Sequence, residues 1–462
     1  MTACILLFVL LLGRILWIKF EGEKPTLKVD LPFPAIGAAH ELPIFISDEK
    51  TGLRRIWVSL LKNDKEIVLL KEEFPVAGFF KGGKIHEKSF KLPIKPRELG
   101  ISEGSAVLRV EVRDLSWWGW WNGSKALFEQ EVMVDIRPPR IDVLSEIHNI
   151  TQGGASFVVY RIFEPCPENG VFVGKNFFPA YPAGDMIPQK ASAPKESDVM
   201  MAFIALDYRQ GPETDIYIKV ADRAGNSAKA RFRYYIRKRN FKKDTLNISD
   251  RFLDWKMPEF DVVVVPSAEK QGEPLPYQVE KFLTINRRIR EENEKKFMEI
   301  VKNGDPVLHW EGIFSGLPGS AKQAGFADRR EYKYGSRIID TQDHMGVDLA
   351  SVAHSPVPAG NKGKVVFTGF IGIYGETVVI DHGMGLFSAY SHLTSIDVQK
   401  GQMVSKGEII GRTGVTGLAA GDHLHFGMIL HNTFVNPIEW WDARWIKTNI
   451  TNKIELAKSR LK

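Results

Sequence analysis

The sequence predicts a mainly β protein with two consecutive β-sandwiches, a helical linker and a further C-terminal domain. Three observations lead to this prediction. Apolar and polar residues alternate in short segments up to about residue 240, the pattern then becomes helical, and eight of the eleven histidines lie from His309 onward. At 462 residues, the chain is long enough for about three domains of ordinary size.

Alternating segments separated by turns predict the first sandwich at residues 22–137. Residues 53–61 and 66–70 flank the turn residues Asn63 and Asp64, and another alternating segment covers residues 105–113. A two-residue period places every second side chain on one face, as in the strands of a sandwich.

A second unit of the same kind is predicted at residues 138–240. Pro138 and Pro139 interrupt the pattern, and residues 140–144 resume it. Residues 220–226 resemble the late-strand turn of bacterial immunoglobulin-like repeats. We therefore expect two immunoglobulin-like β-sandwiches in tandem.

Four tryptophans in the first unit allow two interpretations. They could form a sugar-stacking or membrane-interface patch, because an indole combines an apolar body with an N–H donor. They could equally cover the edge of the sandwich. The residues are Trp117, Trp118, Trp120 and Trp121.

Residues 241–305 are predicted to form a helical linker. Apolar residues recur at helical spacing among charged ones from Tyr277 to Val301, after Pro274 and Pro276.

An apolar run from Thr2 to Phe20 predicts a membrane anchor or signal-anchor at residues 1–20. The run is interrupted by Arg14, and no small-residue cleavage motif follows it. We expect a single-pass protein of the cell membrane with the bulk of the chain periplasmic or extracytoplasmic. The alternative is a buried core helix.

The net charge of +6 is small for a chain of this length. It could favour an anionic surface such as lipid, but no recognition motif for nucleic acid accompanies it. Nucleic acid is therefore not expected as a partner.

Three short motifs point to a zinc hydrolase. They are His344-Met-Gly-Val-Asp348, Tyr390-Ser-His392-Leu and Asp422-His423-Leu-His425-Phe. Residues two apart on a strand share a face, so His423 and His425 can point into one site. A catalytic zinc takes three protein ligands and leaves a position for water. His344, Asp348 and His425 supply such a set, which leaves His392 and His423 for proton transfer and oxyanion stabilisation.

Together these motifs resemble those of the lysostaphin-like (LytM-type) zinc endopeptidases of bacterial cell walls. The framework between them also follows the family pattern, at residues 363–367, 378–385, 398–411 and 413–414, with a closing Asn436-Pro437. The resemblance implies an antiparallel β-sheet groove in a peptidase domain at residues 306–445. A C-terminal tail would then cover residues 446–462.

Carried over to this sequence, the resemblance assigns one Zn²⁺ to the catalytic domain, held by His344, Asp348 and His425. It assigns His392 and His423 to catalysis and leaves open which of them is the general base. Tyr390 could hydrogen-bond the tetrahedral intermediate or simply pack. Four other histidines match no ligand position: His309, His354, His382 and His431.

The implied function is a zinc-dependent endopeptidase that hydrolyses peptide cross-links of peptidoglycan at the outer side of the cytoplasmic membrane. Its expected partners are peptidoglycan peptides, the membrane through the N-terminal helix, and envelope proteins through the β domains. The alternative is a non-enzymatic LytM-like protein that binds and activates a partner amidase. All five polar positions are present, which favours catalysis.

Overall fold

The computed structural model describes residues 22–78, 82–188, 198–264 and 275–462, together with residues 5–6, 10, 13–14, 16–17 and 19–20. The chain divides into two compact units. The first contains residues 1–140 with the short segments 164–168 and 220–228, and the second contains the remainder. Strands predominate in both, so the prediction of a mainly β protein is confirmed.

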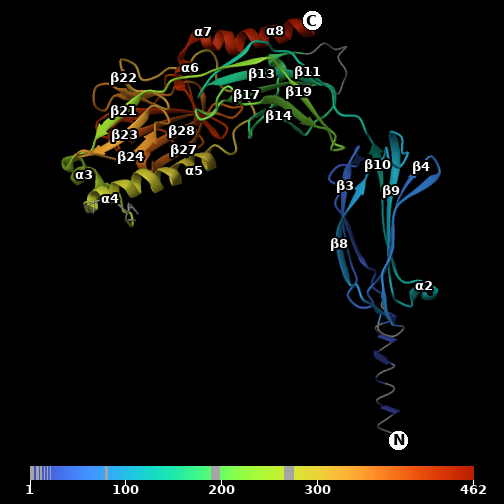
Figure 1. Cartoon of the computed structure of the whole chain (residues 1–462). Helices are drawn as coiled ribbons and strands as arrows, with labels where there is room; N and C mark the ends of the chain where they lie inside the picture. Colours follow the sequence, from blue (N-terminus) through green and yellow to red (C-terminus); the bar gives the residue numbers. More distant parts are fainter. Residues whose placement is uncertain are drawn as a thin grey trace. The chain divides into compact units, whose positions relative to one another are not determined.

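The first unit is built from a three-stranded and a five-stranded sheet (Figure 1). The smaller sheet has the order β1-β3-β8 and the larger one the order β2-β10-β9-β4-β5. Their bounds are β1 Thr26–Val29, β2 Ala35–Ile36, β3 His40–Ser47, β4 Leu53–Lys62, β5 Lys65–Glu73, β8 Glu87–Ile94, β9 Gly104–Asp114 and β10 Lys125–Val134.

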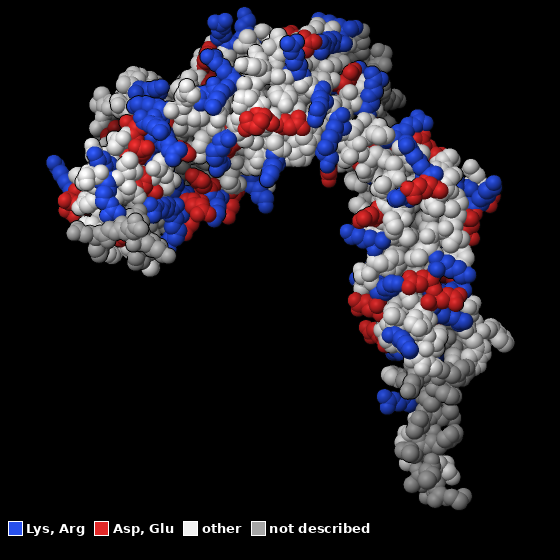
Figure 2. Space-filling view, in the orientation of Figure 1, with Lys and Arg blue, Asp and Glu red and all other residues white. Residues whose placement is uncertain are grey.

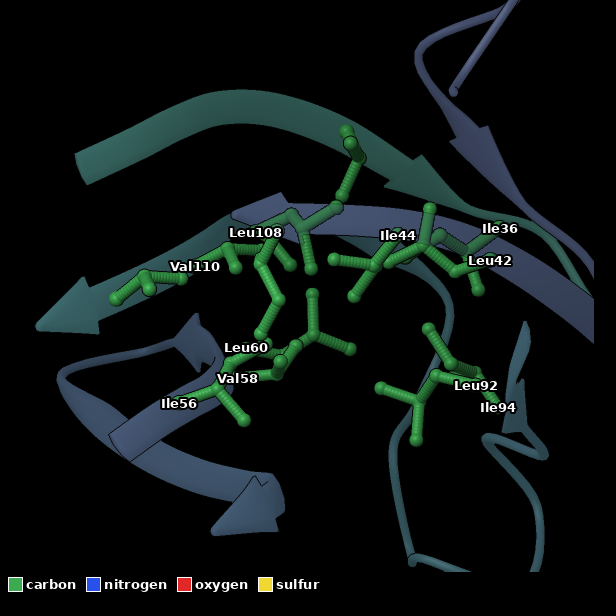
Figure 3. Close-up of a cluster of buried hydrophobic side chains, with 14 of the residues drawn as sticks. Ile36, Leu42, Ile44, Ile56, Val58, Leu60, Leu92, Ile94, Leu108 and Val110 are labelled. Atoms are coloured by element: carbon green, nitrogen blue, oxygen red, sulfur yellow. The ribbon is translucent and has the colours of Figure 1, made fainter. Parts of the chain in front are cut away.

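Buried apolar residues alternate with more exposed ones along the strands, and the buried residues form one core between these two sheets. In β9, every second residue from Ala106 to Val112 is buried, and the same period holds in β3. Figure 3 shows Leu108 lying close to Leu60 in this cluster. Complete burial of one such side chain contributes about 1.5–3 kcal/mol.

The turn between β4 and β5 occurs at the predicted residues. Lys62 pairs with Lys65, which leaves a two-residue loop. Asn63 and Asp64 have φ angles of 49° and 61°. Positive φ at both central residues matches the twist of the flanking strands, and Asn and Asp tolerate it better than most residues.

The predicted single-pass anchor at residues 1–20 is wrong. Among the residues that the structure describes, no helix is long and apolar enough to cross a membrane. A helix needs about 20 consecutive apolar residues to cross the hydrocarbon core. Arg14 interrupts this run, and much of Thr2–Phe20 lies outside the described residues. The predicted single-pass location in the cell membrane is therefore wrong as well, and the structure does not support a membrane partner through this segment.

Two four-stranded sheets form the β-rich part of the chain between residues 141 and 231, with orders β11-β13-β17-β16 and β15-β14-β18-β19. The parallel pair β12 and β20 forms a separate two-stranded sheet. Their bounds are β11 Ile141–Val143, β12 His148–Thr151, β13 Ala155–Ile162, β14 Glu168–Val173, β15 Asn176–Pro179, β16 Tyr181–Pro182, β17 Asp198–Ala205, β18 Ile216–Ala221, β19 Ser227–Arg231 and β20 Tyr234–Arg237.

The C-terminal region contains a ten-stranded, largely antiparallel sheet. Its main path is β22-β25-β32-β29-β28-β27-β30, and β26, β31 and β33 attach beside it. Their bounds are β22 Ala321–Ala324, β25 Val347–Ala350, β26 Pro356–Pro358, β27 Gly363–Ile371, β28 Gly375–Asp381, β29 Leu386–Ile396, β30 Met403–Val404, β31 Ile409–Thr413, β32 Leu424–Leu430 and β33 Thr433–Val435.

Residues 241–305 contain the expected helices and also a strand. Strand β21 pairs in parallel with β23, which pairs with β24, so this segment joins a sheet formed by residues beyond 305. The bounds are β21 Lys243–Asn247, α3 Asp250–Lys256, α4 Tyr277–Thr284, the π-helix η3 Ile285–Ile289, α5 Arg290–Ile300, β23 Arg329–Tyr334 and β24 Arg337–Asp343.

The C-terminal helices pack on β13 of the same unit (Figure 1). Glu439 in α6 (Pro437–Trp441) accepts a hydrogen bond from Ala155 N at 2.8 Å. Lys453 in α8 (Asn452–Leu461) donates to Ser156 Oγ and Phe157 O at 3.1 and 2.9 Å. Because both side chains are buried, their hydrogen bonds connect the C-terminal helices to this strand.

Charged side chains of both signs are interspersed on the face shown in Figure 2. Lysines and arginines do not gather into one broad patch on that face. The net charge of +6 is therefore distributed there and does not point to a particular anionic partner.

We predict that Leu108→Ala lowers the free energy of unfolding of the first unit by about 2–5 kcal/mol, because it opens a cavity in a closed core. Leu127→Ala removes the same atoms from a side chain that is 44% exposed, and should change it by less than about 1 kcal/mol. Hydrogen exchange of β4 and β9 during denaturant titration measures the effect. Equal losses in both variants would contradict the prediction.

A second prediction concerns the pH dependence of stability in the second unit. Burial raises the pKa of Glu439 from 4.5 to about 8, against smaller lowering effects from Ala155 N–H and Arg239. Between these two pH values the unfolded chain has released a proton that the folded chain retains, so the free energy of unfolding falls as pH rises.

Glu439→Gln should therefore show a shallower fall in the urea midpoint between pH 5 and 7 than the wild type. Glu455, whose side chain is 64% exposed, provides the control, and Glu455→Gln should follow the wild-type curve. Parallel curves for the wild type and Glu439→Gln would refute this cause.

Candidate functional site

The three motifs meet because of the register of the C-terminal sheet. Asp348 in β25 lies opposite His425 in β32, and Ser391 in β29 lies opposite the same histidine. His344 precedes β25 by one short turn, and Ala327 N donates to its carbonyl at 2.7 Å. Segments separated by some 80 residues of sequence, as for His344 and His425, are thereby brought into contact.

Three side-chain atoms form a small triangle at the centre of the site. His344 Nε2 lies 2.9 Å from His425 Nδ1 and 3.0 Å from Asp348 Oδ1, and the last two atoms are also 3.0 Å apart. Ligand atoms around a tetrahedral zinc at 2.0–2.1 Å lie about 3.3 Å from each other. The triangle is slightly smaller than one face of such a tetrahedron, so these residues fit a metal.

The chemistry of the three groups also fits a metal. His344 Nδ1 donates to Gly325 O at 2.8 Å, which leaves the lone pair of a neutral imidazole on Nε2. Two imidazole nitrogens and a carboxylate oxygen are a typical donor set for a divalent transition metal. All three residues are buried, so a cation would satisfy groups that otherwise face one another.

Backbone geometry turns His392 towards this triangle. His392 has a φ of 63°, in the left-handed region, so the simple alternation of β29 ends at this residue. Its ring centroid lies 4.8 Å from that of His423 and 5.9 Å from that of His425. His392 Nδ1 donates to Thr416 O at 2.8 Å, and Nε2 therefore carries the lone pair when the ring is neutral.

His423 faces the same site with the same tautomer. Its Nδ1 donates to Gly421 O at 2.7 Å, and its Nε2 lies 3.6 Å from Asp348 Oδ1. Two imidazoles thus present Nε2 for proton transfer beside the three-atom triangle.

Burial and neighbouring charges shift the pKa values of the site residues in different directions. Burial opposes ionisation of Asp348, but the surrounding histidines, led by His344, hold the pKa of its carboxyl well below 3.8. Burial lowers the pKa of His425 to about 4, and burial with the neighbouring imidazoles lowers the pKa of His392 well below 6.5. For His423, burial acts to lower the pKa, but contact with Asp348 outweighs it and raises the pKa above 6.5.

A cavity of about 650 Å³ opens onto the five residues. One of its walls comes from residues 244–248 together with Phe252, Phe282 and Arg290. Tyr374 also lines this cavity, and its ring centroid lies 5.4 Å from that of His425. The segment predicted as a linker therefore forms part of the site.

Tyr390 does not point towards the triangle. Its hydroxyl accepts a hydrogen bond from Gly360 N at 2.7 Å and another from Ser388 Oγ at 3.0 Å. It is fully buried, and its ring packs edge-on against Phe426, 5.1 Å away. Of the two roles considered for Tyr390, packing is the one that this geometry supports.

The other four histidines lie elsewhere. His309 contacts Asp305, His382 contacts Ser388, and the ring of His431 stacks on Tyr181. His354 is exposed and contacts Asp422. None of them lines the cavity described above.

Several residues of the site were not identified from the sequence. Arg330 donates to Asp348 Oδ2 at 2.5 Å, and it belongs to none of the three motifs. Lys256 in α3 donates to Val415 O, beside the carbonyl of Thr416 that holds His392. Apart from its position beside a second arginine, nothing in the sequence distinguishes Arg330. Nothing in the sequence distinguishes Thr416 or Lys256.

Comparison with known proteins agrees with this geometry. Residues 342–437 match the model of peptidase family M23. This region is an M23 peptidase domain. It contains all five polar residues of the site, and the predicted resemblance to the lysostaphin/LytM type is confirmed.

Two curated relatives are each similar to part of this chain. Peptidoglycan DD-endopeptidase ShyA of Vibrio cholerae is 36% identical over 141 residues, which are 30% of this chain and 31% of ShyA. DD-carboxypeptidase/endopeptidase Mpg of Neisseria meningitidis is 38% identical over 95 residues, which are 21% of this chain and 22% of Mpg. The aligned part of this chain therefore spans less than a third of either relative.

Among solved structures, a Pseudomonas aeruginosa protein described as a candidate M23 peptidase aligns with a TM-score of 0.37 and 20% identity. That alignment covers 61% of this chain and 91% of the other. The catalytic domain of lysostaphin from Staphylococcus simulans aligns with a TM-score of 0.24 and 29% identity, over 27% of this chain and 96% of that domain.

We predict that Tyr390→Phe lowers the free energy of unfolding by about 1–3 kcal/mol, because Gly360 N loses its acceptor inside the core. Metal content should remain that of the wild type, since the hydroxyl does not face the site. Tyr277→Phe makes the same chemical change at a residue that is 65% exposed and should be neutral. Loss of metal from Tyr390→Phe at unchanged stability would contradict the assignment.

Proposed function

We propose that this chain is a zinc-dependent endopeptidase that hydrolyses peptide cross-links of peptidoglycan. The observation that carries the proposal is the 2.9–3.0 Å triangle of His344, Asp348 and His425 with two further imidazoles beside it. A hydrolytic zinc site needs three protein ligands and groups that move protons, and these five residues supply both sets. The names of ShyA and Mpg favour a D,D-type cross-link as the substrate.

In this proposal, His344 Nε2, His425 Nδ1 and Asp348 Oδ1 hold the Zn²⁺. When bound, zinc would polarise the scissile carbonyl and lower the pKa of water towards neutrality. The hydrogen bonds from His344 to Gly325 O and from β25 to β32 keep the ligand atoms in place before metal binds. This preorganisation reduces the cost of assembling the site.

His392 and His423 are the proposed proton-handling residues. Each donates Nδ1–H to a backbone carbonyl, which fixes the ring and leaves Nε2 for transfer. One imidazole can accept the proton of the attacking water, and the pair can return a proton to the leaving amine. Both line the cavity that would receive the extended peptide.

The central test uses the purified full-length chain with isolated sacculi. His344→Ala should lose at least tenfold in zinc affinity and release no cross-link fragments above background, because the buried triangle loses one of its ligands. His354→Ala provides the control, since that histidine is exposed and outside the cavity. Metal analysis and mass spectrometry of the released muropeptides provide the two measurements.

The proton-handling role is tested separately with His423→Ala. This variant should retain zinc, but its rate of cross-link cleavage should fall at least a hundredfold.

Full activity in His344→Ala at wild-type metal content would refute the proposed function. A zinc-loaded wild-type chain that cleaves nothing but stimulates an added amidase would support the non-enzymatic alternative instead.

A further inference from the structure

We propose that Arg330 is a positioning residue that holds the Asp348 carboxylate so that a single oxygen faces the metal position. This inference rests on the proposed function. Arg330 Nη2 lies 2.5 Å from Asp348 Oδ2, whereas Asp348 Oδ1 belongs to the triangle with His344 and His425. The two oxygens of one carboxylate thus have different partners.

This division matters because a free carboxylate can rotate and offer either or both of its oxygens. A charge-assisted hydrogen bond to one oxygen removes this freedom and directs the other oxygen. The side chain of Asp348 is only 10% exposed, so water can do little to replace the guanidinium. Without Arg330, Oδ2 would lose its hydrogen-bond donor inside the protein, and nothing there would stop the carboxylate from rotating.

A hydrogen-bond network in the cavity wall reaches the strand that carries Arg330. Arg330 lies in the central strand, β23, of a three-stranded sheet, two residues before Tyr332. The hydroxyl of Tyr332 accepts a hydrogen bond of 3.5 Å from Arg290 Nη2, which also donates to Asn286 Oδ1 at 2.6 Å. Asn286 donates to Asp340 Oδ2 in β24 at 2.7 Å.

A π-helical turn places two members of this network. Asn286 lies within η3, and Arg290 follows it directly at the start of α5. π-helical turns widen a helix locally and often occur at functional sites, because they redirect side chains. The helices of residues 277–300 thereby brace the strand that carries Arg330.

Arg329 provides a matched comparison on the same strand. It is adjacent to Arg330 and carries the same charge, but neighbouring residues of a strand point to opposite faces. Arg329 is exposed, whereas the Arg330 side chain is 20% exposed and contacts Asp348. If positive charge alone favoured zinc binding, both arginines would contribute to it. If Arg330 positions the Asp348 carboxylate, only Arg330 contributes.

The experiment titrates the full-length chain and its variants with Zn²⁺ against a competing chelator, and records the absorption spectrum of the Co²⁺-loaded protein. Arg330→Met should weaken zinc binding by about 10- to 100-fold and change the Co²⁺ spectrum, as expected when a partner of a metal ligand is lost. Arg330→Lys, which keeps a charged donor, should recover part of the loss. Arg329→Met should match the wild type in both measurements.

Wild-type zinc affinity and an unchanged Co²⁺ spectrum in Arg330→Met would overturn the inference, and so would an equal loss in Arg329→Met. If Arg330→Met does not fold, Arg330→Lys alone decides, because a positioning role predicts a shifted Co²⁺ spectrum for a donor of different shape. A wild-type chain that binds no zinc would overturn the proposed function as well. A wild type that binds zinc beside an Arg330→Met variant that binds it equally well would overturn the positioning role alone.

Discussion

The site depends above all on the pairing of β25 with β32. Their register places Asp348 directly opposite His425, and the next strand, β29, places Ser391 opposite the same histidine. A shift of one residue would turn His425 to the other face of the sheet and separate it from Asp348. All seven residues of β32 are buried, so such a shift would also exchange the side chains that pack on its two covered faces. The core therefore maintains the geometry of the polar site.

Around this sheet, buried polar groups make contacts that connect distant segments. Lys256 reaches the loop that orients His392, and Arg330 reaches Asp348 from a strand paired with β21. Each contact brings a charged group out of water, which is unfavourable unless its partners are in place. Lys256 and Arg330 therefore each depend on a partner in the C-terminal sheet region.

Local pattern predicted five polar residues that the structure brings together, but not the residues around them. Two histidines at alternate positions share a strand face in any sheet, so His423 and His425 were recognisable as a pair. His392 was recognised through its motif, although its left-handed backbone departs from strand alternation. Gly325 and Thr416 contribute only carbonyl oxygens, and every residue carries one, so no residue type could have marked them.

The sequence by itself determined the mainly β character, the turn at Asn63-Asp64 and the identity of the five polar residues, because these depend on side-chain chemistry and on periods of two residues. The tertiary structure alone decided that Tyr390 packs away from the site and that Arg330 contacts Asp348. It also decided that residues 244–248, Phe252, Phe282 and Arg290 line the cavity. These contacts join segments far apart in the chain, and only strand register and helix packing determine which segments meet.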